Sequence, residues 1–493
     1  MTSSENTGAL PPAMNTRLAH GIEMESNGHS SGESGFYLMH EGLSAFVARA
    51  VLIEEAAISL DLQYYIYSDD TSGRLLTAKL LEAADRGVRV RLLVDDLGTR
   101  LTNPWVTALD SHPNMEIRVF NPVEGRSGLR RGLEQALNFG RINHRMHNKL
   151  LVADGLAMIT GGRNVADGYF TNAEVEFLDV DVIAIGAIIA DASITFDDYW
   201  NHSVSLPVSK LISLREETHS LEELRTRLRE HLVKEEKSEF RDALRESTLV
   251  KELAAGKVPF QWGTATLYAD PPAKATDHES VPLSDYPGYQ LGQIVKDSQE
   301  RLQITNAYLI PGRRGTELFA ELEERGVQVD ILTNGLGTND TAVAHGAYSR
   351  YRKPLLRAGV RLWELRPTAE REHRMHWFSD KSRATLHAKM MVIDSERSFV
   401  GSINLDSRSF ILNTEIGVLI ENAAVNRQLH RLFETWVAPD AAWRLQLDDR
   451  GRISWHATDD DNRAIVKHRD PDSNFWQRML SRMLSRLPIE SQI

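Results

Sequence analysis

The chain has 493 residues, of which 57 are Lys or Arg and 69 are Asp or Glu, giving a formal net charge of −12 at pH 7. This acidic balance argues against bulk nucleic-acid binding, which needs a basic footprint, although it leaves room for a local basic groove. The chain has no cysteine, which excludes disulfides, thiolate nucleophiles and Cys-ligated metal sites. We expect neither a membrane span nor a signal peptide, because the required apolar runs are absent from the sequence.

The regular part of the sequence contains a repeated order of elements. In the first half a strand, a helix ending at an Arg-Gly turn and a second strand are predicted at 57–67, 75–85 and 88–94. In the second half the same three elements are predicted at 302–310, 316–324 and 327–333. Strand, helix and strand joined by short turns indicate a parallel α/β unit, and its repetition predicts a duplicated α/β domain.

The sequence is expected to divide into five parts. These are a mobile polar tail, a first α/β domain, a charged helical connector, a second α/β domain and a C-terminal extension, at 1–35, 36–205, 206–256, 257–440 and 441–493. The tail is rich in Ser, Asn, Gly and Glu, a composition typical of mobile segments. Residues 213–251 are dense in charged residues and Leu and contain no Pro or Gly, which favours helices with a solvated face.

A sequence motif occurs once in each half. Residues 147–164 read HNKLLVADGLAMITGGRN, and residues 387–404 read HAKMMVIDSERSFVGSIN. Each has His, then Lys two positions later, then Asp and finally Asn, and every such residue in the second copy is 240 positions after its counterpart, as in 387 − 147. Two copies in register with a repeated fold are far less probable by chance than one.

These residue types suit chemistry at a phosphorus atom. His147 and Lys149 on a strand share one face, as do His387 and Lys389. Imidazole can attack phosphorus, an ammonium neutralises phosphoryl oxygens, and an Asn amide donates a hydrogen bond to another oxygen. If the two copies face each other, one imidazole can attack while the other protonates the leaving oxygen, with no metal required.

The paired motif resembles the phospholipase D superfamily, in which two such motifs form one active site across a pseudo-twofold axis. The resemblance covers nearly the whole chain after the tail. It implies an α/β fold of duplicated phospholipase D-like domains, each a mixed, mostly parallel sheet flanked by helices, without metal or cofactor. It also implies a covalent phosphohistidine, for which we favour His147 as nucleophile and His387 as general acid and base. The implied phosphate ligands are Lys149, Lys389, Asn164 and Asn404.

Carboxylates complete the candidate site. Asp154 and Asp394 belong to the motif and are counted with its catalytic residues, but seven positions after each His they would face away, which favours a structural task. The resemblance implies that Glu415 orients His387. Alignment of LDVDVIAIG with NTEIGVLIE places Asp179 in the same role for His147, with Asp181 as the alternative.

Further stretches resemble bacterial cardiolipin synthases with a GGRN first motif, among them GGRNVADGYF, GSINLDSRS and the terminal LPIE. That likeness implies transfer of a phosphatidyl group from phosphatidylglycerol or phosphatidylethanolamine to phosphatidylglycerol, at the bacterial inner membrane. The expected partners are phospholipids and an anionic membrane surface; nucleic acid is not expected, and a protein partner is left open. The alternatives are a phospholipase D that hydrolyses phospholipids to phosphatidic acid, and a metal-independent nuclease.

Three surface features have two interpretations each. The tail FWQRMLSRMLSRL at 475–487 has helical apolar spacing with arginines alongside, which suits either an interfacial helix on an anionic bilayer or a helix packed on the core. His373 and His376 indicate a loop or substrate channel more than a metal site. A basic loop at the site mouth, or an ordinary solvated loop, is expected from Arg126, Arg130, Arg131, Arg141 and Arg145.

Overall fold

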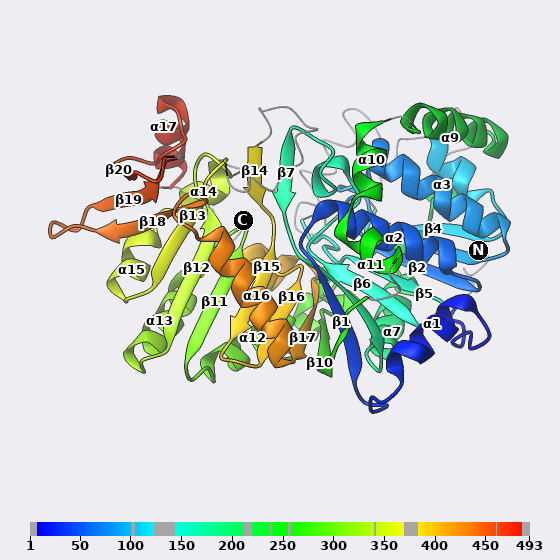
Figure 1. Ribbon diagram of the computed structural model, residues 1–493, viewed down its shortest axis with the longest axis horizontal. Coiled ribbons are helices and arrows are strands. Elements are labelled where there is room, and N and C mark those ends of the chain that lie inside the picture. The colour runs from blue at the N-terminus through cyan, green and yellow to red at the C-terminus, as the bar shows by residue number, and fades with distance from the viewer. Residues whose placement is uncertain are drawn as a thin grey trace.

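The computed structural model describes residues 7–99, 104–122, 143–211, 219–236, 238–254, 258–339, 342–368, 383–459 and 461–485. Two halves of similar architecture lie side by side, each a sheet with helices on its faces, as Figure 1 shows. The predicted duplication of an α/β domain is therefore confirmed.

The sheet of the first half has eight strands, and a parallel group lies within it. In spatial order the strands are β1 (Ser34–Met39), β8 (Asp181–Gly186), β6 (Ala157–Gly161), β5 (Leu150–Ala153), β2 (Ser59–Tyr64), β3 (Arg89–Asp95), β4 (Met115–Phe120) and β9 (Ser205–Pro207). Strands β2, β3 and β4 are parallel, and the other pairings are antiparallel. The sheet is thus mixed, with its parallel strands next to the strand that carries the first motif.

The second half repeats this order and adds a C-terminal hairpin. Its strands are β10 (Gln261–Ala269), β17 (Ile416–Glu421), β16 (Arg397–Gly401), β15 (Lys389–Ile393), β11 (Arg301–Asn306), β12 (Gln328–Asn334), β13 (Arg361–Leu365), β18 (Ala442–Leu447), β19 (Ile453–Thr458) and β20 (Ala464–Lys467). β11, β12 and β13 are parallel, so β15 takes the place that β5 has in the first half. Strands β1 and β10 pair antiparallel and join the two sheets.

Helices cover both sheets. Those of the first half and the connector are α1 (Arg17–Ser26), α2 (Gly42–Glu55), α3 (Thr71–Asp85), α4 (Pro104–Asp110), α7 (Ile189–Trp200), α8 (Val208–Leu211), α9 (Leu221–Glu235), α10 (Glu239–Arg245) and α11 (Thr248–Ala254). Those of the second half are α12 (Pro287–Lys296), α13 (Gly312–Glu324), α14 (Ala342–Tyr348), α15 (Arg352–Arg357), α16 (Ala423–Trp436) and α17 (Phe475–Leu484). None of these described helices is long and apolar enough to cross a bilayer.

The repeated Arg-Gly turns end equivalent helices. α3 and α13 are followed by Gly87 and Gly326, whose φ angles of 95° and 85° lie in the left-handed region. Glycine adopts this region without a Cβ clash, so it ends a helix and lets the chain turn into the next strand. The elements predicted on either side of both turns are present within a few residues of their expected bounds.

A hydrophobic core joins the two halves. Met146 and Val152 of the first half belong to the same buried cluster as Met390 and Val392 of the second. Two further clusters lie within single halves, each between a sheet and its outer helices. Because the shared cluster includes residues next to both motif histidines, burial of this interface fixes the two motifs relative to each other.

The segment expected as a mobile tail is folded in its described part. Residues 17–26 form α1, with Thr16 as its N-cap. The Thr7 carbonyl accepts a hydrogen bond from Arg91 at 2.8 Å, and its hydroxyl accepts one from the Trp200 indole at 3.0 Å. The connector is helical as predicted, and Leu224 of α9 is buried against the first half. The prediction of a mobile tail is wrong for these residues. Their contacts are hydrogen bonds to buried arginine and tryptophan side chains, which the polar composition of the segment does not reveal.

Candidate active site

Backbone pairing between the halves brings the two motifs together. Strand β7 (Val175–Leu178) of the first half pairs in parallel with β14 (Arg383–Leu386) of the second, and the amide of His387 donates to the Leu178 carbonyl at 2.8 Å. The equivalent contact on the other side is an isolated bridge from Met146 to Thr414, whose carbonyl accepts from the His147 amide at 2.8 Å. Each motif histidine therefore lies at the point where its segment of the chain pairs with the backbone of the other half.

This crossing pairs each histidine with a carboxylate of the opposite half. His147 Nδ1 lies 2.8 Å from Glu415 Oε2, and His387 Nδ1 lies 2.6 Å from Asp179 Oδ2. The sequence prediction identified both carboxylates but assigned them to the wrong histidines. Asp179 directly follows Leu178, the strand residue beside His387, so cross-half strand pairing rather than repeat equivalence sets the partner.

Asp181, the alternative to Asp179, has a different role. Its carboxylate lies 2.8 Å from Arg49 and 3.6 Å from Arg163, and all three side chains are buried. Arg163 in turn donates to the Asp179 carbonyl at 2.7 Å. Asp181 therefore balances buried arginines behind the site and does not contact a motif histidine.

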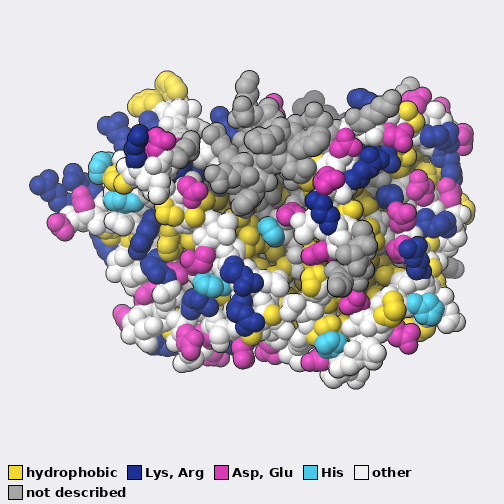
Figure 2. Space-filling model, viewed as in Figure 1, with side chains coloured by type: hydrophobic (Ala, Val, Ile, Leu, Met, Phe, Trp, Pro, Cys, Tyr) yellow, Lys and Arg dark blue, Asp and Glu magenta, His cyan; other side chains and the backbone are white. Residues whose placement is uncertain are grey.

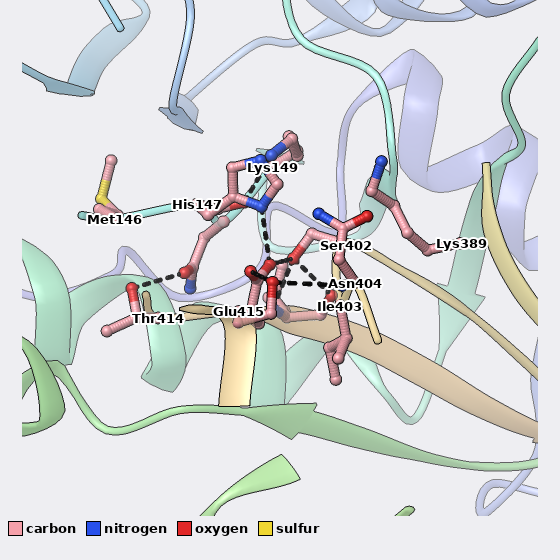
Figure 3. A network of polar contacts seen from close by, with 12 residues as sticks. Met146, His147, Lys149, Lys389, Ser402, Ile403, Asn404, Thr414 and Glu415 are labelled. Carbon is pink, nitrogen blue, oxygen red and sulfur yellow. Dashed lines mark hydrogen bonds and ion pairs between the residues drawn. The ribbon is translucent and has the colours of Figure 1, made fainter. Parts of the chain in front are cut away.

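Glu415 has a richer polar environment than Asp179. Figure 3 shows its carboxylate with His147 on one side and the Ser402 hydroxyl on another. Ser409 also donates to Glu415 Oε1, at 2.8 Å. In the first half Gly162 stands where Ser402 stands in the second, and a Cβ there would lie 2.1 Å from Asp179 Oδ1. Gly162 has no side chain and so leaves room for the Asp179 carboxylate. At the equivalent place in the second half, the Ser402 hydroxyl lies beside the Glu415 carboxylate.

Each motif lysine donates a hydrogen bond to the backbone of the histidine in its own motif. Lys149 Nζ donates to the His147 carbonyl at 2.6 Å, and Lys389 Nζ donates to the His387 carbonyl. Both lysines are buried, with exposures of 1% and 2%. Burial, together with repulsion from Lys389, lowers the pKa of Lys149 to about 7, although Glu415 and two aspartates oppose the shift. The site therefore holds cationic charge that an anionic ligand would stabilise.

The two asparagines are also buried beside the histidines. Asn164 Oδ1 accepts from the Ile66 amide at 3.1 Å, and its Nδ2 donates to the Tyr169 hydroxyl at 2.9 Å. That hydroxyl lies 3.5 Å from His387 Nε2. Within the described structure Asn404 Oδ1 has no hydrogen-bond partner, although the residue is only 5% exposed. A buried polar atom without a partner is costly, and an amide oxygen accepts hydrogen bonds, so the group that would satisfy Asn404 Oδ1 is a donor such as a hydroxyl.

Burial sets the protonation of both histidines. It lowers the pKa of His147 to about 4 and that of His387 to about 3, and the neighbouring lysines act in the same direction. Both imidazoles are therefore neutral at pH 7. With Nδ1 bound to a carboxylate, each neutral ring has its Nε2 lone pair available, which is the form required of a nucleophile or a general base.

Comparison with known proteins agrees with this geometry. Residues 50–200 and 291–437 match the family described as cardiolipin synthase, PLD-like domain. The chain belongs to this family. A cardiolipin synthase C from Escherichia coli is 39% identical over 470 residues, which are 93% of this chain and 96% of that protein. A cardiolipin synthase A from Pseudomonas syringae is 26% identical over 399 residues, which are 80% of this chain and 67% of that protein.

A solved structure shows the same fold. The crystal structure of a phosphatidylserine synthase from Haemophilus influenzae aligns with a TM-score of 0.58 at 12% identity, covering 96% of this chain and 99% of that chain. The resemblance to the phospholipase D superfamily is thus confirmed, and the chain is an enzyme of this superfamily by family and fold.

The motif aspartates of this family member lie outside the site. Asp154 accepts from the backbone amides of Ala57, Ile58 and Ser59 at 2.8 to 3.2 Å. Asp394 accepts from three backbone amides at the start of β11. Their place in the catalytic set is therefore wrong, while the structural task expected from their offset is supported: each ties the motif hairpin to the neighbouring strand.

Some predicted features lie elsewhere or outside the described residues. Arg145 is 1% exposed and lies 3.3 Å from Asp95, so it is a buried structural residue. The other four arginines of the expected basic loop, and His373 and His376, lie outside the described residues. Sequence reasoning missed Tyr169, Ser402 and Ser409. Ser402 occupies a motif position where the first copy has Gly, which was a visible difference between the copies.

Proposed function

We propose that this protein transfers a phosphatidyl group to phosphatidylglycerol and so forms cardiolipin. The observation that carries the proposal is the meeting of two neutral imidazoles, each bound through Nδ1 to a carboxylate, with Lys149 and Lys389 beside them. Two imidazoles suit a two-step displacement, because one can carry the phosphoryl group while the other moves the proton. The family supports a phospholipid substrate.

In the first step Nε2 of His147 attacks phosphorus, a P–N bond forms, and the P–O bond to the leaving alcohol breaks. His387 gives that alcohol a proton. In the second step His387 takes the proton from the glycerol hydroxyl of a phosphatidylglycerol, whose oxygen attacks phosphorus as the P–N bond breaks. The choice of His147 over His387 as nucleophile rests on the family resemblance, since the two half-sites are near-symmetric.

His387 takes up the proton for the first step when the substrate binds. Burial and the lysines keep both imidazoles neutral in the empty site, with pKa values of about 4 and about 3. A bound phosphodiester adds negative charge beside His387, which raises its pKa and favours uptake of a proton from solvent. The same charge is stabilised by the lysine ammoniums and by the Asn164 and Asn404 amides, as electrostatic catalysis requires.

We further propose that α17 holds the enzyme on an anionic membrane surface. Exposed apolar side chains cover this helix, and Figure 2 shows them as a yellow projection at the upper left, where α17 lies. They are Phe475, Trp476, Met479, Leu480 and Met483, which are 41 to 68% exposed. Arg482 is exposed beside them, and Ser481 anchors the other face through a 2.8 Å hydrogen bond to His345. An apolar face beside arginine suits an anionic bilayer.

The test is lipid product analysis. Purified protein is incubated with vesicles of phosphatidylglycerol, with and without phosphatidylethanolamine, and the products are identified by mass spectrometry. We expect cardiolipin as the main product and phosphatidic acid as a minor one. Phosphatidic acid as the main product under all conditions would contradict transfer and establish a hydrolase. Metal-free degradation of DNA, without any lipid product, would establish the nuclease alternative.

A further inference from the structure

A large cavity in the second half lies next to the site. It has a volume of about 650 Å³ and lies between α12, α13 and the π-helical turn Arg408–Leu412. Its walls are mainly apolar, and they include Leu291, Val295, Ile304, Phe319, Met391 and Phe410. This volume is within the range of small-molecule sites, about 300–1,000 Å³. An apolar cavity of this size accommodates a flexible hydrocarbon rather than a polar ligand.

Part of the cavity wall is formed by segments that carry or follow the second motif. Ile403, Leu405 and Asp406 line it, and they flank Asn404 in the chain. Figure 3 shows the Ile403 side chain leaving the chain on the opposite side from the Asn404 amide. Met391, another wall residue, follows Lys389 by two positions on β15, so both lie on one face of that strand.

A short hydrogen-bonded chain links the cavity wall to the site. The buried Asp406 accepts from the Ser409 amide at 2.7 Å, and the Ser409 hydroxyl donates to Glu415 at 2.8 Å. Glu415 is the carboxylate that binds His147. The cavity wall is therefore connected to the catalytic imidazole through the hydrogen bonds of Asp406, Ser409 and Glu415.

The rim of the cavity exposes apolar side chains to solvent. Leu283 is 57% exposed, Tyr289 is 41% exposed and Ile411 is 50% exposed, and all three line the cavity. A hydrocarbon chain could therefore pass from a bilayer into the cavity over apolar surface. The cavity of about 640 Å³ in the first half differs, because Asp69, Asp70, Arg74 and Arg227 line it.

We propose that the cavity beneath α12 binds one acyl chain of the phospholipid whose phosphate lies at Lys389 and Asn404. This inference rests on the proposed function and specifies which part of the substrate the second half recognises. Since the cavity has a finite volume of about 650 Å³, it favours chains up to a limiting length. Burial of each methylene multiplies affinity by about fourfold until that length is reached.

Gly292 of α12 allows a clean test. It lines the cavity, and a Cβ added there meets nothing within 4 Å. Gly292→Leu therefore adds a Cβ without a clash and introduces a larger side chain at a position that lines the cavity, and removal of a helix glycine does not weaken the helix. Gly21 of α1 also has open space around its Cβ position and is not a cavity residue. Gly21→Leu is thus the matched control.

Turnover is measured with phosphatidylglycerols of increasing acyl length in mixed micelles. We expect Gly292→Leu to lower kcat/KM for long-chain lipid about tenfold or more, to shorten the preferred chain, and to leave dihexanoyl lipid within about twofold of wild type. Gly21→Leu should match wild type at every length. Equal loss at all lengths, or no change at any, would overturn the proposal.

A second pair of variants and a binding measurement keep the result independent of folding and of the reaction. Leu283→Asp at the rim should disfavour long chains, whereas Val233→Asp, at the 68% exposed position on α9, should not. If the product is phosphatidic acid, the same length series applies to its release. If there is no turnover, affinity for a fluorescent long-chain fatty acid is measured: weaker binding by Gly292→Leu supports the cavity, and equal binding overturns it.

Discussion

Glu415, from the second half, accepts the Nδ1 hydrogen bond of His147, from the first half, at a distance of 2.8 Å. Its counterpart joins His387 of the second half to Asp179 of the first at 2.6 Å. Neither half therefore contains a complete imidazole–carboxylate pair. The active site exists only when the halves are packed together, which the shared core around Met146 and Met390 ensures.

Replacing either histidine should stop the reaction without unfolding the protein. We expect His147→Ala and His387→Ala each to reduce turnover at least about 100-fold, because each imidazole serves a separate step. His20→Ala, at a solvent-exposed position on α1, is the control and should keep full activity. Lipid product assays with circular dichroism give the comparison. More than about a tenth of wild-type activity in either site variant would contradict the two-histidine account.

The pH dependence of kcat/KM should reflect the shifted groups of the free enzyme. Burial lowers the pKa of His147 to about 4, so this imidazole stays unprotonated as pH falls from 7 to 5. Burial lowers the pKa of His387 to about 3, so uptake of the proton that it gives to the leaving alcohol becomes easier over the same range, and kcat/KM should not fall. Burial also lowers the pKa of Lys149 to about 7, so its ammonium, and activity with it, should be lost as pH rises above 7. A midpoint near 6.5 on the acid side, typical of an exposed histidine, would contradict this assignment.

Chelation should leave catalysis in place. The Lys149 and Lys389 ammoniums and the Asn164 and Asn404 amides are buried beside the histidines and supply the positive charge and hydrogen bonds that a phosphoryl group needs. Turnover of a soluble short-chain lipid should therefore survive EDTA, and this substrate avoids effects of divalent ions on vesicles. Complete loss that one divalent ion restores would count against the mechanism.

Removal of residues 475–493 should weaken binding to anionic vesicles more than it lowers turnover of a short-chain soluble substrate. The reason is that α17 presents exposed Phe475, Trp476 and Met483 with Arg482, and each basic residue near an anionic surface contributes about 1 kcal/mol. Sedimentation with vesicles of phosphatidylglycerol measures the effect. Uncharged vesicles are the control. Unchanged affinity for anionic vesicles, or a truncated protein that fails to fold, would indicate that α17 packs on the protein core instead of binding the membrane.

The sequence predicted the repeat and the motif residues because both depend on local spacing. The Arg-Gly turns and the equal 240-residue offsets are visible in one chain, and in the structure each motif histidine lies close enough to the lysine of the other motif for that lysine to lower its pKa. The sequence could not show which carboxylate binds which histidine. Alignment of the two halves pairs each carboxylate with the histidine of its own half, whereas in the structure it binds the histidine of the other half. Strands β7 and β14 pair between halves, and that pairing is a property of the folded interface. The roles of Ser402 and Ser409 depend on the same tertiary contacts.

The crossed pairing is tested most directly by the histidine tautomers. Ring ¹⁵N chemical shifts of the histidine-labelled protein report whether Nδ1 or Nε2 holds the proton, and His147→Gln and His387→Gln assign the two signals. We predict that both rings are Nδ1-protonated in the wild type, that Asp179→Asn perturbs His387 alone, and that Glu415→Gln perturbs His147 alone. Perturbation of His147 by Asp179→Asn, with His387 unchanged, would contradict a site shared between the two halves.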